Sequence, residues 1–329
     1  MARESGYFTM LINAEMGIYQ ITIPLPFKLN HVHCYAITGD DGWWLVDTGL
    51  NYAPSHAAWE EFFRTNGIAY QDIKGIYLTH YHPDHFGAAG WLQQKSGAPV
   101  YMSAIDAAAV QRVWQHTADA MPKMRAMFVD YGMPEEMAGG VVEEMNKLSQ
   151  LTQPHPQLSL VQPNSLIQLG NQVYQALLTP GHADGHLCFY NQKHAVLFAG
   201  DHVLPKITSN IGWWPEANPD PLHDYLQSLE ELLDFPVDAV LPAHGQVFTQ
   251  LEARIIQLTA HHAERLARIE SSAKVAVTAY EVCRQTFKQE LGPHELRFAM
   301  AETLSHLIYL VNQGRLQLQT RDGIKYFSA

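Results

Sequence analysis

The first 80 residues alternate between short apolar runs and turn residues. Four runs rich in β-branched and aromatic side chains predict β-strands at 17–25, 34–38, 43–47 and 74–79. The turn from Gly39 to Gly42 predicts a hairpin between the second and third strands. Apolar side chains at helical spacing over 56–67, closed by Gly67, predict an amphipathic helix before the fourth strand. A second helix is predicted from Phe86, followed by a short strand.

The pattern becomes helical from Ile105 to about Leu151. This stretch is rich in methionine, at Met121, Met124, Met127, Met133, Met137 and Met145. Methionine at helical spacing commonly fills gaps in a core. Long insertions also serve as covers over active sites, and an adaptable apolar face would suit a substrate tail. Both interpretations of this helical insertion, core or lid, stay open.

Strand patterns return in the second half, at 173–179, 187–190, 195–200 and 238–242, with a helix predicted over 223–233. After Gly245 the chain is mostly helical up to Gly314. Residues 315–328 then predict two short strands around the turn Arg321-Asp322-Gly323. Helices closed by such a hairpin resemble a winged-helix module. We therefore expect a catalytic domain over 1–250 and a C-terminal module over 251–329.

Composition and charge disfavour several classes of protein. The 329 residues are 47% hydrophobic, which is enough for one large domain or for a domain with a small appendage. A net charge of -12 disfavours general attraction to nucleic acid or anionic lipid. Three cysteines, Cys34, Cys188 and Cys283, form no disulfide framework and predict buried thiols in a reducing compartment. Without a long apolar stretch or a signal-peptide pattern, we expect a cytoplasmic protein.

The strongest chemical signal is the run Thr79-His80-Tyr81-His82-Pro83-Asp84-His85, directly after a predicted strand. A strand that ends in a loop presents several side chains toward one point. Three imidazoles and one carboxylate within six positions offer four metal ligands, and packing alone seldom requires such a cluster. The run therefore predicts a metal site.

Four more candidate ligands follow other apolar runs, namely Asp47, His182, Asp201 and His244. Each is bordered by a glycine, which permits the tight turns that aim side chains inward. A lone histidine is more often a core or surface residue, but the repetition at strand ends indicates one shared edge.

In this order, the motif loop and the four strand-end residues resemble the metallo-β-lactamase superfamily over roughly residues 17–248. The resemblance implies an α+β fold of the αββα sandwich type, with two sheets face to face and helices outside. The helical insertion at about 105–151 would be part of this sandwich domain, and the small winged-helix-like module would follow it at the C-terminus.

The resemblance also implies a dinuclear metal site. The first metal ion would be bound by His80, His82 and His182, and the second by Asp84, His85 and His244. Asp201 would bridge the two ions. Asp47 would support the site by holding ligand imidazoles through hydrogen bonds.

The donor chemistry agrees with this assignment. Imidazole and carboxylate ligands suit Zn²⁺, with Mn²⁺ or Fe as alternatives. Two such ions lower the pKa of a bridging water, so that a hydroxide is present at neutral pH and can attack a carbonyl. Asp84 and Asp47 are then the residues we expect to act in catalysis.

Weaker candidates lie next to these motifs. His186 and His202 are candidates for orienting ligands or contacting substrate, although a structural hydrogen bond is the more common reason for a loop histidine. Lys206 is a candidate for binding an acidic group. Trp213 and Trp214 are candidates for a pocket wall.

The sequence therefore predicts a hydrolase for an ester, thioester or lactone, with a small acyl compound as its substrate. The alternative is a phosphodiesterase or endoribonuclease that binds nucleic acid through residues 251–329. That segment has a net charge of only +2, and binding would require one face formed by Arg265, Arg268, Lys274, Arg284 and Lys288. We instead expect the module to pack against the catalytic domain or a second copy of the chain.

Overall fold

The computed structural model describes residues 9–287 and 290–329. A sheet of seven strands follows the order of the chain, β1-β2-β3-β4-β5-β6-β7. Its strands are β1 Thr9–Asn13, β2 Ile18–Pro24, β3 His31–Gly39, β4 Gly42–Val46, β5 Ile73–Tyr77, β6 Val100–Ser103 and β7 Leu158–Val161. The first four strands are antiparallel neighbours, and β4, β5, β6 and β7 run parallel.

The second sheet has five strands in the order β12-β11-β10-β9-β8. They are β8 Leu166–Leu169, β9 Gln172–Leu178, β10 Leu187–Asn191, β11 Val196–Gly200 and β12 Ala239–Pro242. Three of its pairings are antiparallel, while β11 and β12 are parallel. Strands β9, β11 and β12 consequently point the same way.

The core between the sheets follows from the alternation of side chains along each strand. On β3, Tyr35 and Ile37 face the second sheet, where the Tyr35 ring lies 5.1 Å from that of Phe198. Their neighbours Cys34 and Ala36 belong to the other apolar cluster, which includes Trp59 and Phe62 of the first helix. Each sheet therefore has two covered faces, and the predicted α+β sandwich is confirmed.

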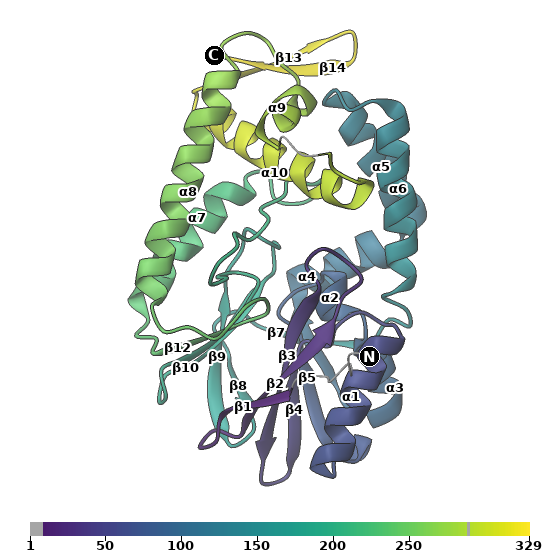
Figure 1. Cartoon of the computed structure of the whole chain (residues 1–329), viewed down its shortest axis with the longest axis vertical. Coiled ribbons are helices and arrows are strands. Elements are labelled where there is room, and N and C mark those ends of the chain that lie inside the picture. Colours follow the sequence, from purple (N-terminus) through teal and green to yellow (C-terminus); the bar gives the residue numbers. More distant parts are fainter. Residues whose placement is uncertain (1–8, 288–289) are drawn as a thin grey trace, which may run out of the picture.

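Helices cover the outer faces of the sheets (Figure 1). Helix α1 Ala53–Asn66 ends at Gly67 in the left-handed conformation, as predicted. The helix predicted from Phe86 is instead two pieces, α2 Pro83–Phe86 and α3 Ala89–Ser96. The break lies at Ala88, whose backbone N–H donates to the carbonyl of Gly49, 2.8 Å away, and not to the preceding helical turn. The second sheet is covered by α7 Pro221–Glu231, which begins and ends two residues before the predicted 223–233.

The insertion is helical, as expected. It consists of α4 Ala104–Val110, a π-helical turn Gln111–Gln115, α5 Thr117–Asp130 and α6 Glu135–Gln150. Five of its six methionines are buried, and Met137 is partly buried. Most of these side chains therefore fill the core between α5, α6 and their neighbours.

The C-terminal part consists of α8 Leu251–Ser272, α9 Ala279–Thr286, α10 Pro293–Asn312 and the hairpin β13 Gln317–Arg321 with β14 Ile324–Ser328. It lies beyond the open edge of the two sheets, opposite the β3–β4 turn (Figure 1). Helix α10 packs against α6, α7, α8 and α9. The predicted hairpin is present, whereas a winged-helix module and a boundary at 250 stay predictions.

Candidate metal centre

The predicted ligands meet because their strands end at the same edge of the sandwich. Strands β4 and β5 are parallel, so Asp47 and the loop from Thr79 to His85 leave the first sheet side by side. In the second sheet β9, β11 and β12 point the same way, and His182, Asp201 and His244 follow their carboxyl ends. Ligands that are up to 164 positions apart in the chain are therefore brought together.

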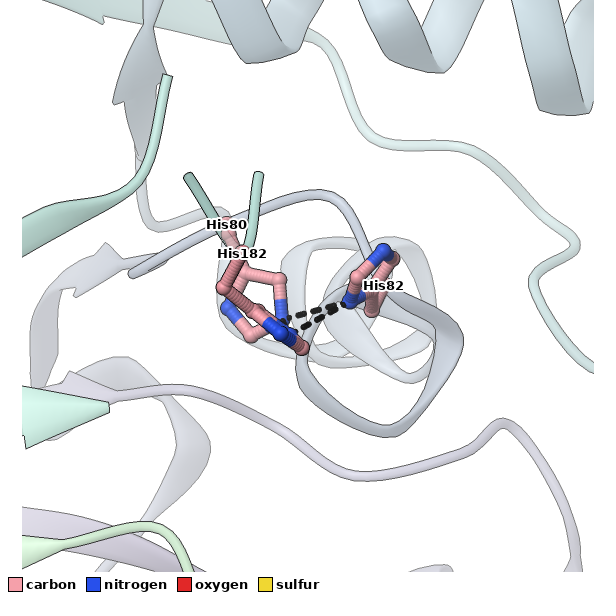
Figure 2. A group of neighbouring side chains, drawn as sticks. All are labelled: His80, His82 and His182. Carbon is pink, nitrogen blue, oxygen red and sulfur yellow. Dashed lines mark hydrogen bonds between the residues drawn. The ribbon is translucent and has the colours of Figure 1, made fainter. Parts of the chain in front are cut away.

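Three imidazoles form a tight group at this edge. Nε2 of His80, Nδ1 of His82 and Nε2 of His182 lie 2.9 to 3.2 Å from one another. Figure 2 shows these nitrogens turned toward a common point. Nitrogens that share a tetrahedral ion at about 2.0–2.1 Å lie roughly 3.3 Å apart. The distances between these nitrogens are close to the separation that a shared metal ion would impose.

Hydrogen bonds on the far side of the rings fix which nitrogens are free. Nδ1 of His182 lies 2.8 Å from the carbonyl oxygen of Asn210, so it must be the donor. The hydroxyl of Thr79 donates to Asp47 and therefore accepts from Nδ1 of His80, 3.0 Å away. In both rings Nε2 is therefore unprotonated, and its lone pair faces the centre of the three imidazoles. Burial also keeps the pKa of His80 well below its ordinary value, which favours the neutral, ligating form.

A second group lies beside the first. The Asp84 carboxylate is 3.7 Å from Nε2 of His85 and 3.5 Å from Nε2 of His244. Nδ1 of His85 is occupied by Asp47 at 2.8 Å, and Nδ1 of His244 by the carbonyl of His31 at 2.8 Å. Both Nε2 atoms are buried without a hydrogen-bond partner. Buried polar atoms are normally satisfied, so these two orphans indicate a ligand.

Asp201 stands between the two groups. One carboxylate oxygen lies 3.6 Å from His85 and 3.4 Å from His244, and the other lies 3.4 Å from His182. The first oxygen is also buried and without a partner. Burial opposes the charged form of His244, but Asp201 and Asp84 outweigh it and raise its pKa to about 10. The carboxylates thus hold excess negative charge that a cation would neutralise.

The residues behind the ligands are held in place by hydrogen bonds. Asp47 accepts from the backbone and hydroxyl of Thr79 as well as from His85, and adopts the uncommon left-handed conformation with φ 59° to do so. Nε2 of His186 accepts from the backbone N–H of Asp201 at 3.2 Å. A side chain at Gly200 would come within 2.6 Å of that nitrogen. Glycine is therefore needed next to the bridging carboxylate.

The weaker candidates have different positions. His202 is fully buried, with its ring 5.2 Å from that of Tyr225 and its Nε2 near Ser228, so it packs behind the site and does not line a cavity. Lys206 is exposed and lies outside the lining of the cavities. Trp213 packs on Tyr131, while Trp214 lines a cavity. Of these four residues, the structure thus places Trp214 alone on a cavity wall.

Two cavities meet at the candidate metal centre. The main cavity, about 280 Å³, is lined by Asp84, Asp201 and His244 and by apolar side chains that include Leu25, Leu148 and Leu204. The side cavity, about 60 Å³, is lined by Met124, Met145, Trp114 and Trp214. His82, His182, Asn210, Arg297 and Phe298 line both cavities.

The C-terminal contribution to these cavities was not predicted. Arg297 and Phe298 come from α10, which was expected to serve packing or dimerisation. The available signal was an arginine within an otherwise apolar stretch of helix. It identifies no partner on its own, because the contact with the strand-end loops is made only by the tertiary fold.

The metallo-beta-lactamase superfamily model matches residues 28–244, and the metallo-beta-lactamase-like C-terminal domain model matches residues 266–329. The chain belongs to the metallo-beta-lactamase superfamily. It is a metal-dependent hydrolase, as its relatives and its candidate metal-binding groups also indicate. The superfamily member described here has no helix, within the part of the chain described, that is long and apolar enough to cross a membrane.

Among curated relatives, a probable metallo-hydrolase of Bacillus subtilis, YqjP, is 26% identical over 94% of this chain and 97% of its own length. An atrochrysone carboxyl ACP thioesterase of Passalora fulva is 25% identical over 45% of this chain and 46% of its own length. The family therefore includes proteins named as thioesterases, although that match is partial.

Two solved structures are similar over almost the whole chain. A metallo-beta-lactamase family protein from Thermus thermophilus has a TM-score of 0.87 and 31% identity, covering 95% of this chain and 99% of its own. A beta-lactamase domain protein from Burkholderia ambifaria has a TM-score of 0.86 and 26% identity, covering 97% and 94%. The C-terminal elements thus belong to an arrangement that these proteins share.

Proposed function

We propose that this metallo-hydrolase binds two divalent metal ions and hydrolyses the carbonyl group of a thioester, ester or lactone. The observation that carries the proposal is the position of Asp201, whose two oxygens face two separate groups of ligand atoms. A single ion would leave one of these groups, with its orphaned nitrogens, unexplained.

His80, His82 and His182 would hold one ion, Asp84, His85 and His244 the other, and Asp201 would contact both. Nitrogen and oxygen donors without sulfur suit Zn²⁺, with Mn²⁺ or Fe as alternatives. Bound divalent ions supply polarisation of a carbonyl and a water that is deprotonated at neutral pH.

The chain supplies the remaining functions. Asp84 lines the main cavity with its side chain 21% exposed, so its carboxylate can accept a hydrogen bond from the attacking water and orient it. Asp47 is buried and acts through His85, which it holds by the Nδ1–H. His186 holds Asp201 through its backbone. These are positioning roles that keep the ligands in place during the reaction.

The main cavity favours an acyl substrate. Leucine side chains and Phe298 form much of its wall, so an acyl chain can replace water next to the carboxylates. The thioesterase named among the relatives acts on an acyl carrier protein substrate according to its name. Both observations support the thioester within this substrate class.

Metal analysis combined with a hydrolysis screen tests the proposal. We expect close to two metal ions per chain and turnover of acyl thioesters, esters or lactones by the Zn-loaded or Mn-loaded protein. Phosphodiesters and short RNA serve as the comparison substrates. One ion or fewer per loaded chain, or turnover of RNA alone, would refute the proposal.

The nucleic-acid alternative receives no support from the C-terminal geometry. Arg265 is nearly buried and forms an ion pair with Glu302 inside the module. Lys288 lies outside the described residues. With Arg265 withdrawn, the four of these cations that the structure describes do not all lie on one exposed face.

A further inference from the structure

A buried arginine faces the candidate active site without a counter-ion. Arg297 of α10 is only 8% exposed, and its guanidinium forms no hydrogen bond or ion pair with any described residue. Its Nε is buried and without a partner. A buried cation is costly unless it is paired, so the protein maintains an unfavourable arrangement at this position.

The surroundings hold the guanidinium in place without neutralising it. Its central carbon lies 4.0 Å from the ring centroid of Phe298 and 6.0 Å from that of Trp214. Burial lowers the pKa of Arg297 to about 10, so the side chain is still charged at neutral pH. Tyr81 opposes this lowering most, followed by Asp84 and Glu144, yet none of the three forms a hydrogen bond or an ion pair with Arg297.

The two other cationic side chains that line the side cavity, Lys123 and Arg112, have different surroundings. Lys123, which also lines the side cavity, pairs with Glu216 at 2.7 Å. Arg112 acts on Asp106 and Asp184, lowering the pKa of both carboxyls against the stronger effect of their burial. Arg112 also forms no hydrogen bond or ion pair, but it is partly exposed and lines the side cavity without reaching the main one. Among the described residues, Arg297 is thus the buried cation that lines both cavities.

The position of Arg297 relates it to the reaction. It lines both cavities, together with the ligands His82 and His182. A substrate with its carbonyl at the metal centre can therefore reach Arg297 with a second group. The side cavity, about 60 Å³, has room for a group the size of several waters.

We propose that Arg297 is a specificity residue that binds an anionic oxygen group, a carboxylate or a phosphate, on the substrate. The guanidinium is suited to two parallel hydrogen bonds with either group. The substrate class is thereby narrowed to acyl compounds that carry a negatively charged oxygen group on the acyl side or on the thiol side. The effect of Arg297 on hydrolysis rests on the proposed function, whereas the binding of an anion to Arg297 does not.

Three substrates distinguish where the charge lies. Pentanoyl-pantetheine is neutral, glutaryl-pantetheine adds a carboxylate on the acyl side, and pentanoyl-phosphopantetheine adds a phosphate on the thiol side. We expect the wild-type protein to prefer one of the anionic substrates by about 10- to 100-fold in kcat/KM, the range for a hydrogen bond to a charged group. The preferred substrate identifies the source of the anion.

The variant Arg297→Gln should lose this preference, and Arg297→Lys should keep part of it. Arg268→Gln is the matched control, because Arg268 is exposed on α8 and has the same charge. A wild-type protein with no anionic preference, or a preference that survives in Arg297→Gln, would overturn the inference while leaving the proposed function intact.

Binding without turnover separates the two proposals. If none of the three thioesters is hydrolysed, the thioester proposal fails, and thermal melting in glutarate or inorganic phosphate still tests Arg297. We expect one of these anions to raise the melting temperature of the wild type but not of Arg297→Gln. Equal shifts in both proteins, or none, would refute an anion site. If Arg297→Gln fails to fold, the same comparison is made with Arg297→Met, which retains the bulk of the side chain.

Discussion

The side-chain amide of Asn210 donates a hydrogen bond to the carboxylate of Glu302, 3.0 Å away. The backbone carbonyl of the same asparagine accepts the Nδ1–H of His182. Helix α10 is thus connected through one residue to a candidate metal ligand. Glu302 is fixed in turn by its ion pair with Arg265 of α8. The C-terminal part therefore helps to orient the metal centre as well as to line it.

Removing this connection should weaken metal binding. We expect Glu302→Leu to reduce metal affinity about tenfold, the lower end of the effect of residues that orient ligands. Glu302→Gln should restore most of the affinity, because its amide oxygen can still accept from Asn210. Competition with a chromophoric chelator measures both values. Glu270→Gln, which breaks a surface pair with Arg315, is the control and should bind metal as the wild type does.

Asp84→Ala should separate the two halves of the centre. The three imidazoles around His80 stay intact, so we expect about one metal ion per chain and a loss of kcat by orders of magnitude. Elemental analysis and kinetics check the two parts. Lys206→Ala, an exposed change outside the cavities, should retain both ions. Loss of both ions from Asp84→Ala would contradict two separate groups.

The methionines of α5 should differ in their effects. Met124 lines the side cavity, whereas Met127 is buried without reaching either cavity. We expect Met124→Gln to raise KM for substrates that occupy the side cavity with little change for an acetyl ester. Met127→Gln should instead lower the stability by about 1–3 kcal/mol, because it buries an amide among apolar groups. Kinetics with both substrate sizes and denaturant unfolding measure the two effects. If Met124→Gln lost activity equally with the large substrate and the acetyl ester, α5 would serve only as part of the core.

A buried histidine pair should make the fold sensitive to acid. Nδ1 of His262 donates to Nε2 of His306 at 3.1 Å, and Nδ1 of His306 donates to the carbonyl of Glu302. Burial lowers the pKa of His262 to about 2, below the ordinary 6.5. The unfolded chain therefore binds this proton first as the pH falls, and stability is lost below about pH 6.5.

For His262 alone the loss amounts to about 2 kcal/mol between pH 8 and pH 5. His262→Gln can keep the hydrogen bond without titrating, so its stability should fall less over this range. Urea unfolding at each pH, with chelator present to exclude metal release, provides the measurement. The exposed His223→Gln should keep the wild-type slope. An unchanged slope in His262→Gln would refute the assignment.

The strand-end chemistry was predictable because it is local. The run from His80 to His85 follows an apolar strand, and parallel strands bring Asp47 beside it through their shared direction. The expected turn glycines were also informative: Gly181 and Gly200 have the positive φ that other residues rarely adopt. These features depend on a few residues that are neighbours in the sequence, so a local sequence pattern is enough to predict them.

Other elements were missed for physical reasons. Strands β7 and β8 are short, half-exposed strands at the ends of their sheets, and their mixed pattern gives a weak signal. Whether the side chains of His202 and Lys206 reach a cavity depends on the direction that the chain takes after Asp201. That direction is set by which neighbouring side chains are buried. Arg297 and Glu302 act across more than 80 residues of sequence, and no local pattern indicates a partner at that distance.

The bond between Asn210 and Glu302 also bears on how the protein is made. All seven candidate ligands have been synthesised once residue 244 is added, but His182 has its full set of supports only after α10 has formed. A nascent chain on the ribosome would therefore hold an incompletely ordered centre until α10 has been translated. The seven ligands therefore reach their final geometry only well after they have all been synthesised.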